Sequence, residues 1–244
     1  MPPILYLVRH AEGFHNVNHS IHIRDATLTE RGKEQCKVLK SSFPYHDKVS
    51  LVLSSPLRRA IQTAVLGLGP SISRPEVPYL VIPAAQEVSD VPADKGFPKE
   101  ELQKHIAELF EKEDVGFDLS KIDYGAVEEG WNVKRGYWGE GKTAVTKRAA
   151  DLRTWLFQRP ESHVVLVTHG AFLHFLTEDW TGDDPKRGTG YHNCEMREFM
   201  FTPTSNEQEA HITETEESRK KRGPSCPEDD PIVLEELEAT DRED

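Results

Sequence analysis

Residues 3–11, PILYLVRHA, form an apolar run that stops at an arginine and a histidine. Residues 163–170, HVVLVTHG, repeat this arrangement, because a second apolar run ends at a polar residue and a histidine. Short apolar runs bounded by polar residues are typical of buried parallel strands. The expected strands are 3–8, 49–53, 78–82 and 163–167, followed by a closing strand at 194–202.

Segments of helical periodicity alternate with these strands. The expected helices are 29–43, capped by Thr29, then 101–112, 143–158 and 171–176. After the second strand, Ser54, Ser55 and Pro56 favour another helix, with a serine as cap and the proline at the first helical position. Residues 115–141 lack periodicity and indicate a long loop. The alternation predicts an α/β domain with a single doubly wound, mostly parallel sheet and helices on both faces, in which ligands bind at the carboxyl ends of the strands.

The net charge of the chain is concentrated near its C-terminal end. The 244 residues include 42 Asp and Glu against 30 Lys and Arg, a formal net charge of -12. Residues 203–244 contain 14 of the acidic and 5 of the basic residues, so the first 202 carry a net charge of only -3. This acidic segment has too few apolar side chains to offset its ordering entropy. We expect a catalytic domain at 1–202 and a largely disordered acidic tail at 203–244, in which the run from Ile232 to Leu237 is suited to local docking.

The composition also bears on partners and location. An acidic chain lacks the basic surface that nucleic acid or an anionic membrane requires, so neither is an expected partner. The N-terminal apolar run is too short for a signal peptide, and no segment approaches the roughly 18 to 20 apolar residues of a membrane span. Cys36, Cys194 and Cys226 are too few for a disulfide framework or a zinc site. We expect a cytoplasmic protein; residues 219–222, RKKR, also fit a nuclear signal, although a solvated basic patch is favoured.

Three strand ends carry polar groups that suit an anion. Each of the two histidines, His10 and His169, taken alone, is more simply an ordinary structural residue, but the matched pair at two strand ends favours a site. The helix expected after Ser55 offers free backbone N–H groups and the positive end of its dipole. Arg58 and Arg59 add guanidinium groups, and because they lie about 100 degrees apart on a helix, only one of them is expected to face the site.

Together these motifs resemble the histidine phosphatase superfamily, also called phosphoglycerate mutase-like. The resemblance runs from about residue 4 to residue 176, and the opening at residues 8–17 is similar to that of an uncharacterised plant and fungal branch. No single motif is specific, but their joint occurrence in this order is. The matching residues are Arg9, His10, Ala11 and Glu12 with Asn16, then residues 55–63, Glu87, and Thr168, His169 and Gly170.

The resemblance implies a role for each matching residue. His10 would be the nucleophile that forms a phosphohistidine. Arg9, Arg59 and His169 would hold the phosphoryl oxygens, with Asn16 assisting; of the two adjacent arginines, Arg59 matches the family position. His169 would also take part in catalysis.

Glu87 would be the acid that protonates the leaving oxygen, with Asp90 and Asp94 as alternatives. Asp94 could instead line the pocket, and His15 lies where it would touch substrate. Ala11 stands where the family usually has glycine, which would cost about 1 kcal/mol if the position needs a positive φ.

The expected chemistry needs no cofactor and no metal. Phosphoryl transfer depends mainly on positioning and on stabilising charge on the equatorial oxygens, which two arginines and two imidazoles can do. An alternative metal cluster of His10, His15, His19 and His22 matches no common zinc spacing.

The leading hypothesis is a metal-independent phosphatase acting on a small phosphorylated metabolite. Within the same chemistry, the alternative is phosphoglycerate mutase-type phosphoryl transfer, and from another class, a weakly catalytic phosphate-binding regulatory module. Aromatic and basic residues in the irregular loop are candidates for a lid over the substrate or, equally, for ordinary loop packing: Trp131, Lys134, Arg135, Tyr137 and Trp138.

Overall fold

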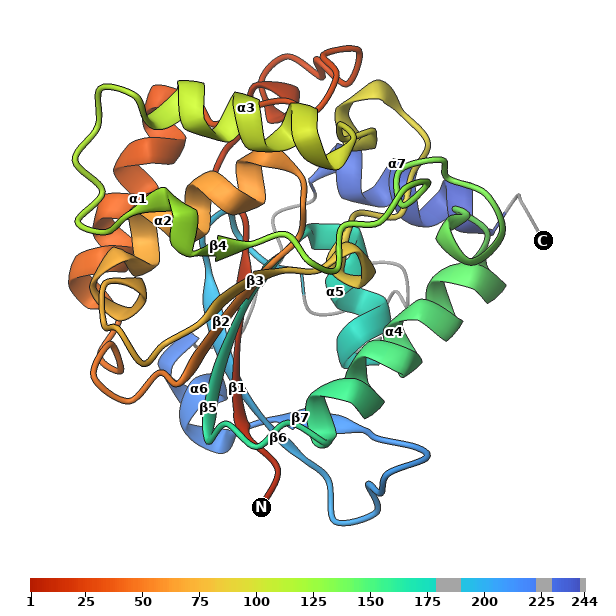
Figure 1. Ribbon diagram of the computed structural model, residues 1–244. Coiled ribbons are helices and arrows are strands. Elements are labelled where there is room, and N and C mark those ends of the chain that lie inside the picture. The colour runs from red at the N-terminus through yellow and green to blue at the C-terminus, as the bar shows by residue number, and fades with distance from the viewer. Residues whose placement is uncertain (179–189, 223–229, 242–244) are drawn as a thin grey trace.

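The computed structural model describes residues 1–178, 190–222 and 230–241 (Figure 1). Within these residues, seven strands form one sheet in the order β4-β3-β2-β5-β1-β6-β7. The first five strands in this order run parallel, and β6 and β7 are antiparallel to their neighbours. The prediction of a mostly parallel sheet is therefore confirmed. The strands are β1 (Ile4–Arg9), β2 (Leu51–Ser54), β3 (Tyr79–Val81), β4 (Ile122–Asp123), β5 (His163–Thr168), β6 (Met196–Phe201) and β7 (Ile212–Glu214).

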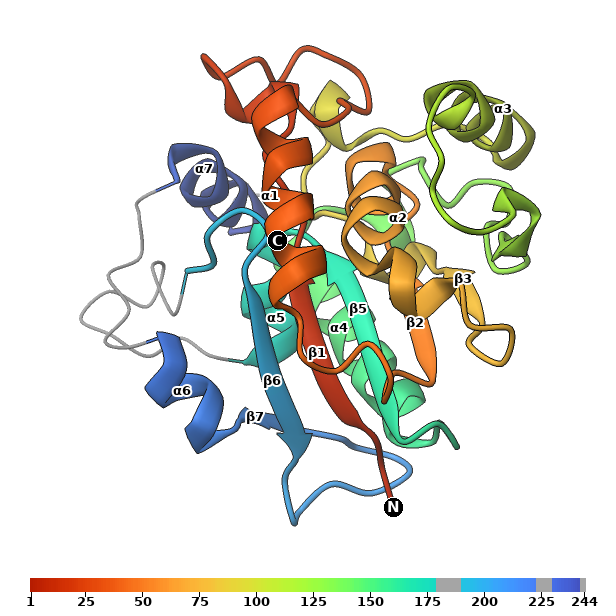
Figure 2. The ribbon, with the colours of Figure 1, turned by 90° about the vertical axis from the view of Figure 1, so that its left-hand side faces the viewer.

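Helices cover both faces of the sheet, as expected (Figure 2). Alternate residues of β1 point to opposite faces. Tyr6 and Val8 join a core formed with α1 and α2, while Leu5 and Leu7 join a second core formed with α4 and α5. The helices are α1 (Glu30–Ser42), α2 (Arg58–Ile72), α3 (Lys99–Phe110), α4 (Lys142–Phe157), α5 (Gly170–Thr177), α6 (Glu216–Arg222) and α7 (Pro231–Thr240).

Two helix starts follow different rules. Thr29 caps α1 as expected, since its hydroxyl accepts a hydrogen bond from the Gly32 N–H at 3.0 Å. The helix α2 begins at Arg58, two residues after the proline that was expected to open it. The reason is that its first free N–H, that of Arg58, is capped by the carboxylate of Asp25 at 2.9 Å, far back in the sequence.

The segment after Thr202 differs from the expected disordered tail. The strand β7 pairs with β6 and extends the sheet, and α7 packs beside α5. Ile212 and Leu237 are buried within the core that α4 and α5 form on the sheet. These few apolar side chains need no core of their own, because they complete one that already exists. The run 232–237 thus lies on the domain, whereas Cys226 is outside the described residues.

The irregular loop expected at 115–141 contains only β4 and two short 3₁₀ turns, at Leu119–Lys121 and Gly136–Trp138. No helix in the described part of the chain is long and apolar enough to cross a membrane.

Candidate active site

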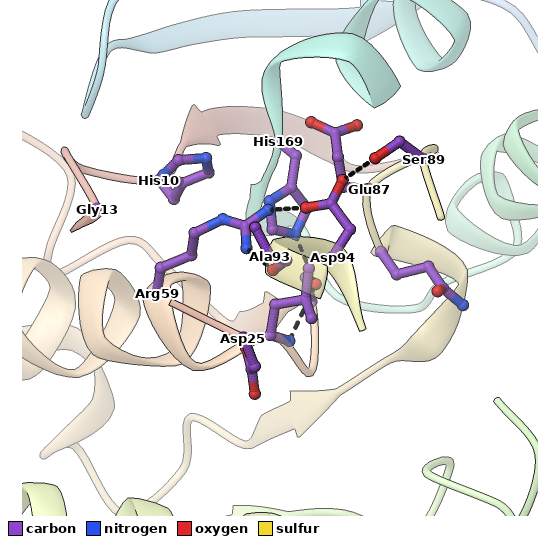
Figure 3. Close-up of polar contacts among 12 residues, drawn as sticks. His10, Gly13, Asp25, Arg59, Glu87, Ser89, Ala93, Asp94 and His169 are labelled. Carbon is purple, nitrogen blue, oxygen red and sulfur yellow. Dashed lines mark hydrogen bonds and ion pairs between the residues drawn. The ribbon is translucent and has the colours of Figure 1, made fainter. Parts of the chain in front are cut away.

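The carboxyl ends of β1 and β5 bring the two histidine motifs together. The strands pair in parallel with Arg9 opposite Thr168, so the residues that follow, His10 and His169, also lie side by side. The His10 N–H donates to the Thr168 carbonyl at 2.9 Å, and the two imidazole centroids are 5.1 Å apart. Figure 3 shows both rings facing the same space as the Arg59 side chain. Parallel pairing thus assembles a site from motifs about 160 residues apart.

The geometry of His10 determines which ring nitrogen is free. Its Nδ1 lies 2.8 Å from the Ala11 carbonyl oxygen, which can only accept, so Nδ1 carries the proton and Nε2 keeps its lone pair. Burial lowers the pKa of His10 well below its usual range, and the charges of Arg59 and Arg9 lower it further. At neutral pH the imidazole is therefore uncharged, with a nucleophilic Nε2.

Ala11 fits its position without strain. Its N–H donates to the Thr63 hydroxyl at 3.0 Å, and it is absent from the described non-glycine residues with positive φ. The cost that a left-handed backbone would impose on an alanine does not arise here.

Arg59, and not Arg58, enters the site. Its side chain is 1% exposed and donates to the Ala93 carbonyl at 2.7 Å and to the Asp94 carboxylate at 2.6 Å. Arg58 turns away, donates to the Asp25 carbonyl, and lies over the Phe97 ring. The different directions follow from the angle between successive residues on a helix.

The second guanidinium belongs to Arg9, at the end of β1. Its Nη1 donates to the Tyr191 carbonyl at 2.6 Å, and its Nη2 pairs with the Asp230 carboxylate. The charges of Arg9 and Arg59 both lower the pKa of His10 and of His15, so all four groups lie close together.

Several buried nitrogens in this region have no hydrogen-bond partner among the described residues. Asn16 illustrates the arrangement: its Oδ1 accepts the Gly13 N–H at 3.0 Å, which leaves its Nδ2 without a partner. The His15 ring is 5.2 Å from that of His10. Buried donors without partners cost roughly 1 to 3 kcal/mol each, so such a set is characteristic of a binding site for an acceptor-rich anion. The nitrogens are Arg9 Nε, Arg59 Nε, His15 Nδ1, Asn16 Nδ2 and His169 Nδ1.

Glu87 lies at the N-terminus of α5. Its carboxylate accepts from the N–H groups of Phe172 at 2.9 Å, Ala171 at 3.2 Å and its own neighbour Val88 at 3.0 Å. Burial raises the pKa of Glu87 above its usual range, and the nearby Asp94 carboxylate raises it further, against the opposing effects of Arg59 and the backbone donors. A buried carboxyl that retains its proton above its usual pKa is suited to donate it.

The other two candidate acids are engaged differently. Asp94 is fully buried and bridges the Arg59 guanidinium and the Ser89 hydroxyl, each at 2.6 Å. Asp90 is exposed and pairs with Lys95 at 2.7 Å. Asp94 thus holds an arginine in place, and Asp90 lies outside the site.

The alternative metal cluster does not assemble. His10 and His15 are close, but His19 is exposed and pairs with Glu235 at 3.0 Å, and His22 is exposed. Among residues 1–178, 190–222 and 230–241, no three or more His, Cys, Asp or Glu side chains are grouped as metal ligands.

The candidate lid residues do not lie together: two of them are buried in the domain and the others are exposed or half-buried. The Trp131 indole is buried in the core and packs against Gly96, where a Cβ would lie 2.4 Å from the ring. Lys134 is also buried, and its ammonium donates to the Glu87 carbonyl at 2.7 Å. Burial lowers the pKa of Lys134 to about 8. Arg135 and Tyr137 are exposed and Trp138 is half-buried.

Other site residues were not singled out from the sequence. Ser55 lies within a quoted motif, yet its hydroxyl contact with His169 Nε2, at 2.7 Å, joins residues 114 positions apart. Arg148, on α4, donates to the carbonyls of Gln86 at 2.5 Å and Ala84 at 3.1 Å, and so fixes the backbone that carries Glu87. No sequence pattern marks Asp230 or Glu236 as a site residue, because both are acidic residues within an acidic segment.

The fold and the site together define an α/β protein in which two imidazoles and two guanidinium groups lie close together at the carboxyl ends of parallel strands. The chain belongs to the histidine phosphatase superfamily (branch 1), whose family model matches residues 5–212.

Relatives and solved structures agree with this membership. The chain is 28% identical over 230 residues to phosphoglycerate mutase-like protein 1 of Arabidopsis thaliana, covering 82% of each chain. It is 25% identical over 207 residues to a probable phosphatase of Schizosaccharomyces pombe, covering 84% of this chain and 88% of that one. The resemblance to a plant and fungal branch is therefore confirmed. A mycobacterial glucosyl-3-phosphoglycerate phosphatase shares the fold, with a TM-score of 0.53 and 20% identity over 87% of this chain and 97% of its own.

Proposed function

We propose that the protein is a metal-independent phosphatase. It hydrolyses the phosphate monoester bond of a small phosphorylated metabolite through a phosphohistidine on His10. The observation that carries the proposal is the pairing of an uncharged His10, with Nε2 free, with buried donors that lack protein partners. Membership of the superfamily supports it, as do the phosphatase names of similar proteins.

The first half-reaction transfers the phosphoryl group to the enzyme. His10 Nε2 attacks phosphorus as the bond from phosphorus to the ester oxygen breaks, and Glu87 gives its proton to that oxygen, which leaves as an alcohol. In the second half-reaction, water attacks phosphorus while the Glu87 carboxylate takes its proton. The bond from phosphorus to Nε2 breaks, and inorganic phosphate leaves.

Arg9, Arg59, Asn16 and His169 stabilise the charge on the equatorial oxygens. Ser55 Oγ accepts the Leu57 N–H at 3.2 Å, and its own hydrogen is available to His169 Nε2. This arrangement leaves the His169 proton on Nδ1, as a donor to a phosphoryl oxygen. Charge-assisted hydrogen bonds of this kind contribute roughly 1.5 to 3 kcal/mol each.

The test is a screen of phosphorylated metabolites for release of inorganic phosphate, with and without a chelator, using the unmodified chain and His10→Ala. We expect release that is insensitive to the chelator and abolished in the variant. Chelator-sensitive release would count against the mechanism. Interconversion of phosphoglycerates, primed by a bisphosphorylated form, would favour mutase-type transfer instead.

The acid is tested separately with Glu87→Gln. This variant should slow hydrolysis of alkyl esters far more than that of aryl esters, because only the poor leaving groups need a proton. Equal slowing of both classes would remove Glu87 from the role of acid.

A further inference from the structure

The helix α7 lies against the site, although it belongs to the acidic segment near the C-terminal end. Figure 1 shows α7 next to α5, whose N-terminal N–H groups donate to the Glu87 carboxylate. A Cβ built on Gly170 would lie 2.7 Å from Val233 of α7 and 3.2 Å from Arg9 Nε. The side chain of Val233 therefore packs in the space left by a glycine directly beside a phosphate-binding arginine.

The carboxylate of Asp230, at the start of α7, forms an ion pair with Arg9. Asp230 Oδ2 pairs with Arg9 Nη2, while Asp230 Oδ1 caps α7 by accepting the Ile232 N–H at 3.1 Å. The Arg9 side chain is 5% exposed and that of Asp230 is 20% exposed. One carboxyl group thus fixes the start of the helix and at the same time neutralises a cation that the phosphoryl group needs.

A second carboxyl group of α7 that faces the site is that of Glu236, about two turns further along the helix than Asp230. Its side chain is buried, forms a hydrogen bond with Asp94, and lies in the field of Glu87 and Arg59. Burial raises the pKa of Glu236 well above its usual range, and the neighbouring Glu87 and Asp94 raise it further, so this carboxyl enters the site as a neutral acid. The helix therefore covers the Asp94–Arg59 pair as well as binding Arg9.

Little apolar packing holds the helix there. Of its ten residues, Ile232 and Leu237 are the buried apolar side chains, and Val233 is partly buried against the core beside α5. Segments with few buried apolar contacts open at low free-energy cost relative to the whole fold. A dianionic phosphate, which offers several acceptor oxygens to both arginines, has the chemistry to displace a single carboxylate.

We propose that α7 is an internal competitor of the substrate phosphoryl group: Asp230 neutralises Arg9 and takes its Nη2 group, leaving Nε, and Glu236 covers the Arg59–Asp94 pair until a phosphate ester displaces the helix. While α7 is docked in this way, the helix inhibits the protein. This inference rests on the proposed function, because it takes Arg9 and Arg59 as the phosphate-binding cations.

The first test measures binding of inorganic phosphate to the full chain by calorimetry. Asp230→Asn keeps an oxygen that caps α7 but removes the negative charge that pairs with Arg9. Leu237→Ser weakens the docking of the helix without changing charge. Each should bind phosphate about tenfold more tightly, because the binding-competent fraction rises. The matched controls are Glu235→Gln, an exposed carboxylate of the same helix, and Val38→Ser, an exposed valine on α1; both should leave the affinity unchanged.

The second test distinguishes a competitor from a lid. Saturating phosphate should increase amide hydrogen exchange across 231–240 in the unmodified chain, because the displaced helix loses its contacts. Decreased exchange would mean that α7 closes over the ligand, and it would overturn the proposal.

The outcomes separate the two proposals. If Asp230→Asn and Leu237→Ser bind phosphate no more tightly than the unmodified chain, while all three bind it and hydrolyse an aryl phosphate, only the role of α7 fails. If none of the three binds phosphate, the proposed function and the role of α7 both fail.

Discussion

His10 and Glu87 are buried in one site, yet the proposed chemistry needs them in opposite protonation states. Burial favours the uncharged form of each group, which lowers the pKa of the histidine and raises that of the carboxyl. The two uncharged forms are the nucleophile and the acid that hydrolysis of an ester requires. One physical cause, desolvation, therefore prepares both residues.

These shifts predict the pH profile of kcat/KM. Activity should rise with pH through the lowered pKa of His10 and fall as pH passes the raised pKa of Glu87, since the base must be free and the acid protonated. Initial rates with one alkyl ester across the pH range check this. In Glu87→Gln the falling limb should disappear from the residual activity; a falling limb that persists would assign it to another group.

Arg59 and Arg58 offer a matched pair of variants. Arg59→Ala should lower kcat/KM by roughly tenfold to a hundredfold, because the charge-assisted hydrogen bond from Arg59 Nε to the phosphoryl group is lost. Arg58→Ala removes an equal charge from the same helix turn and should change kcat/KM far less. Steady-state kinetics on both variants test the assignment, and equal losses would contradict it.

At the scale of elements, the start of α2 depends on Asp25. This buried carboxyl caps the Arg58 N–H, and burial raises its pKa to about 6 despite the charge of Arg58. A raised acid pKa means that the folded state keeps a proton that the unfolded chain releases. Stability is therefore lost as pH rises from the unfolded pKa to about 6.

Asp25→Asn retains an oxygen that can cap α2 and removes this pH dependence. The difference in free energy of unfolding between the variant and the unmodified chain should shift by about 2 to 3 kcal/mol in favour of the variant as the pH rises from about 4 to about 7. Denaturant titrations at both pH values measure the difference. A stability difference that is the same at both values would show that the pKa of Asp25 is not raised.

Local sequence predicted those elements whose determinants are local. The apolar runs of β1 and β5 and the threonine cap of α1 are properties of a few neighbouring residues, and each was found within about two residues of its expected position. The start of α2 was displaced because its cap is Asp25, a distant residue that no local pattern connects to it.

The candidate site was predictable to the same degree. His10, His169 and Glu87 follow strands, so the rule that ligands bind at carboxyl ends applies to them. The partners that orient them, such as Ser55 for His169, depend on contacts between segments far apart in the chain. Asp230 could not be recognised, because nothing local distinguishes it from other acidic residues of its segment.

At the scale of the whole molecule, the acidic segment is divided between fold and site. The strand β7 extends the sheet, Leu237 fills the core beside α5, and Asp230 reaches Arg9. Net charge alone could not reveal this, because packing of a segment on an existing domain requires only a few well-placed apolar side chains.

A chain that ends at Thr202 tests the boundary expected from composition. It would lack β7 and α7 and would expose the apolar surface that Ile212 and Leu237 cover. Because each buried side chain of this size contributes roughly 1.5 to 3 kcal/mol, the shortened chain should have a clearly lower Tm by calorimetry. An unchanged Tm would make residues 203–244 an independent tail.

The most direct test of the central claim is detection of the covalent intermediate. The unmodified chain, mixed with a phosphate monoester and quenched rapidly under alkaline conditions that preserve phosphohistidine, should gain the mass of one phosphoryl group. Peptide mapping should place that group on His10, and His10→Ala should gain none. Hydrolysis that proceeds without any phosphorylated protein, or with the phosphoryl group on another residue, would contradict the mechanism.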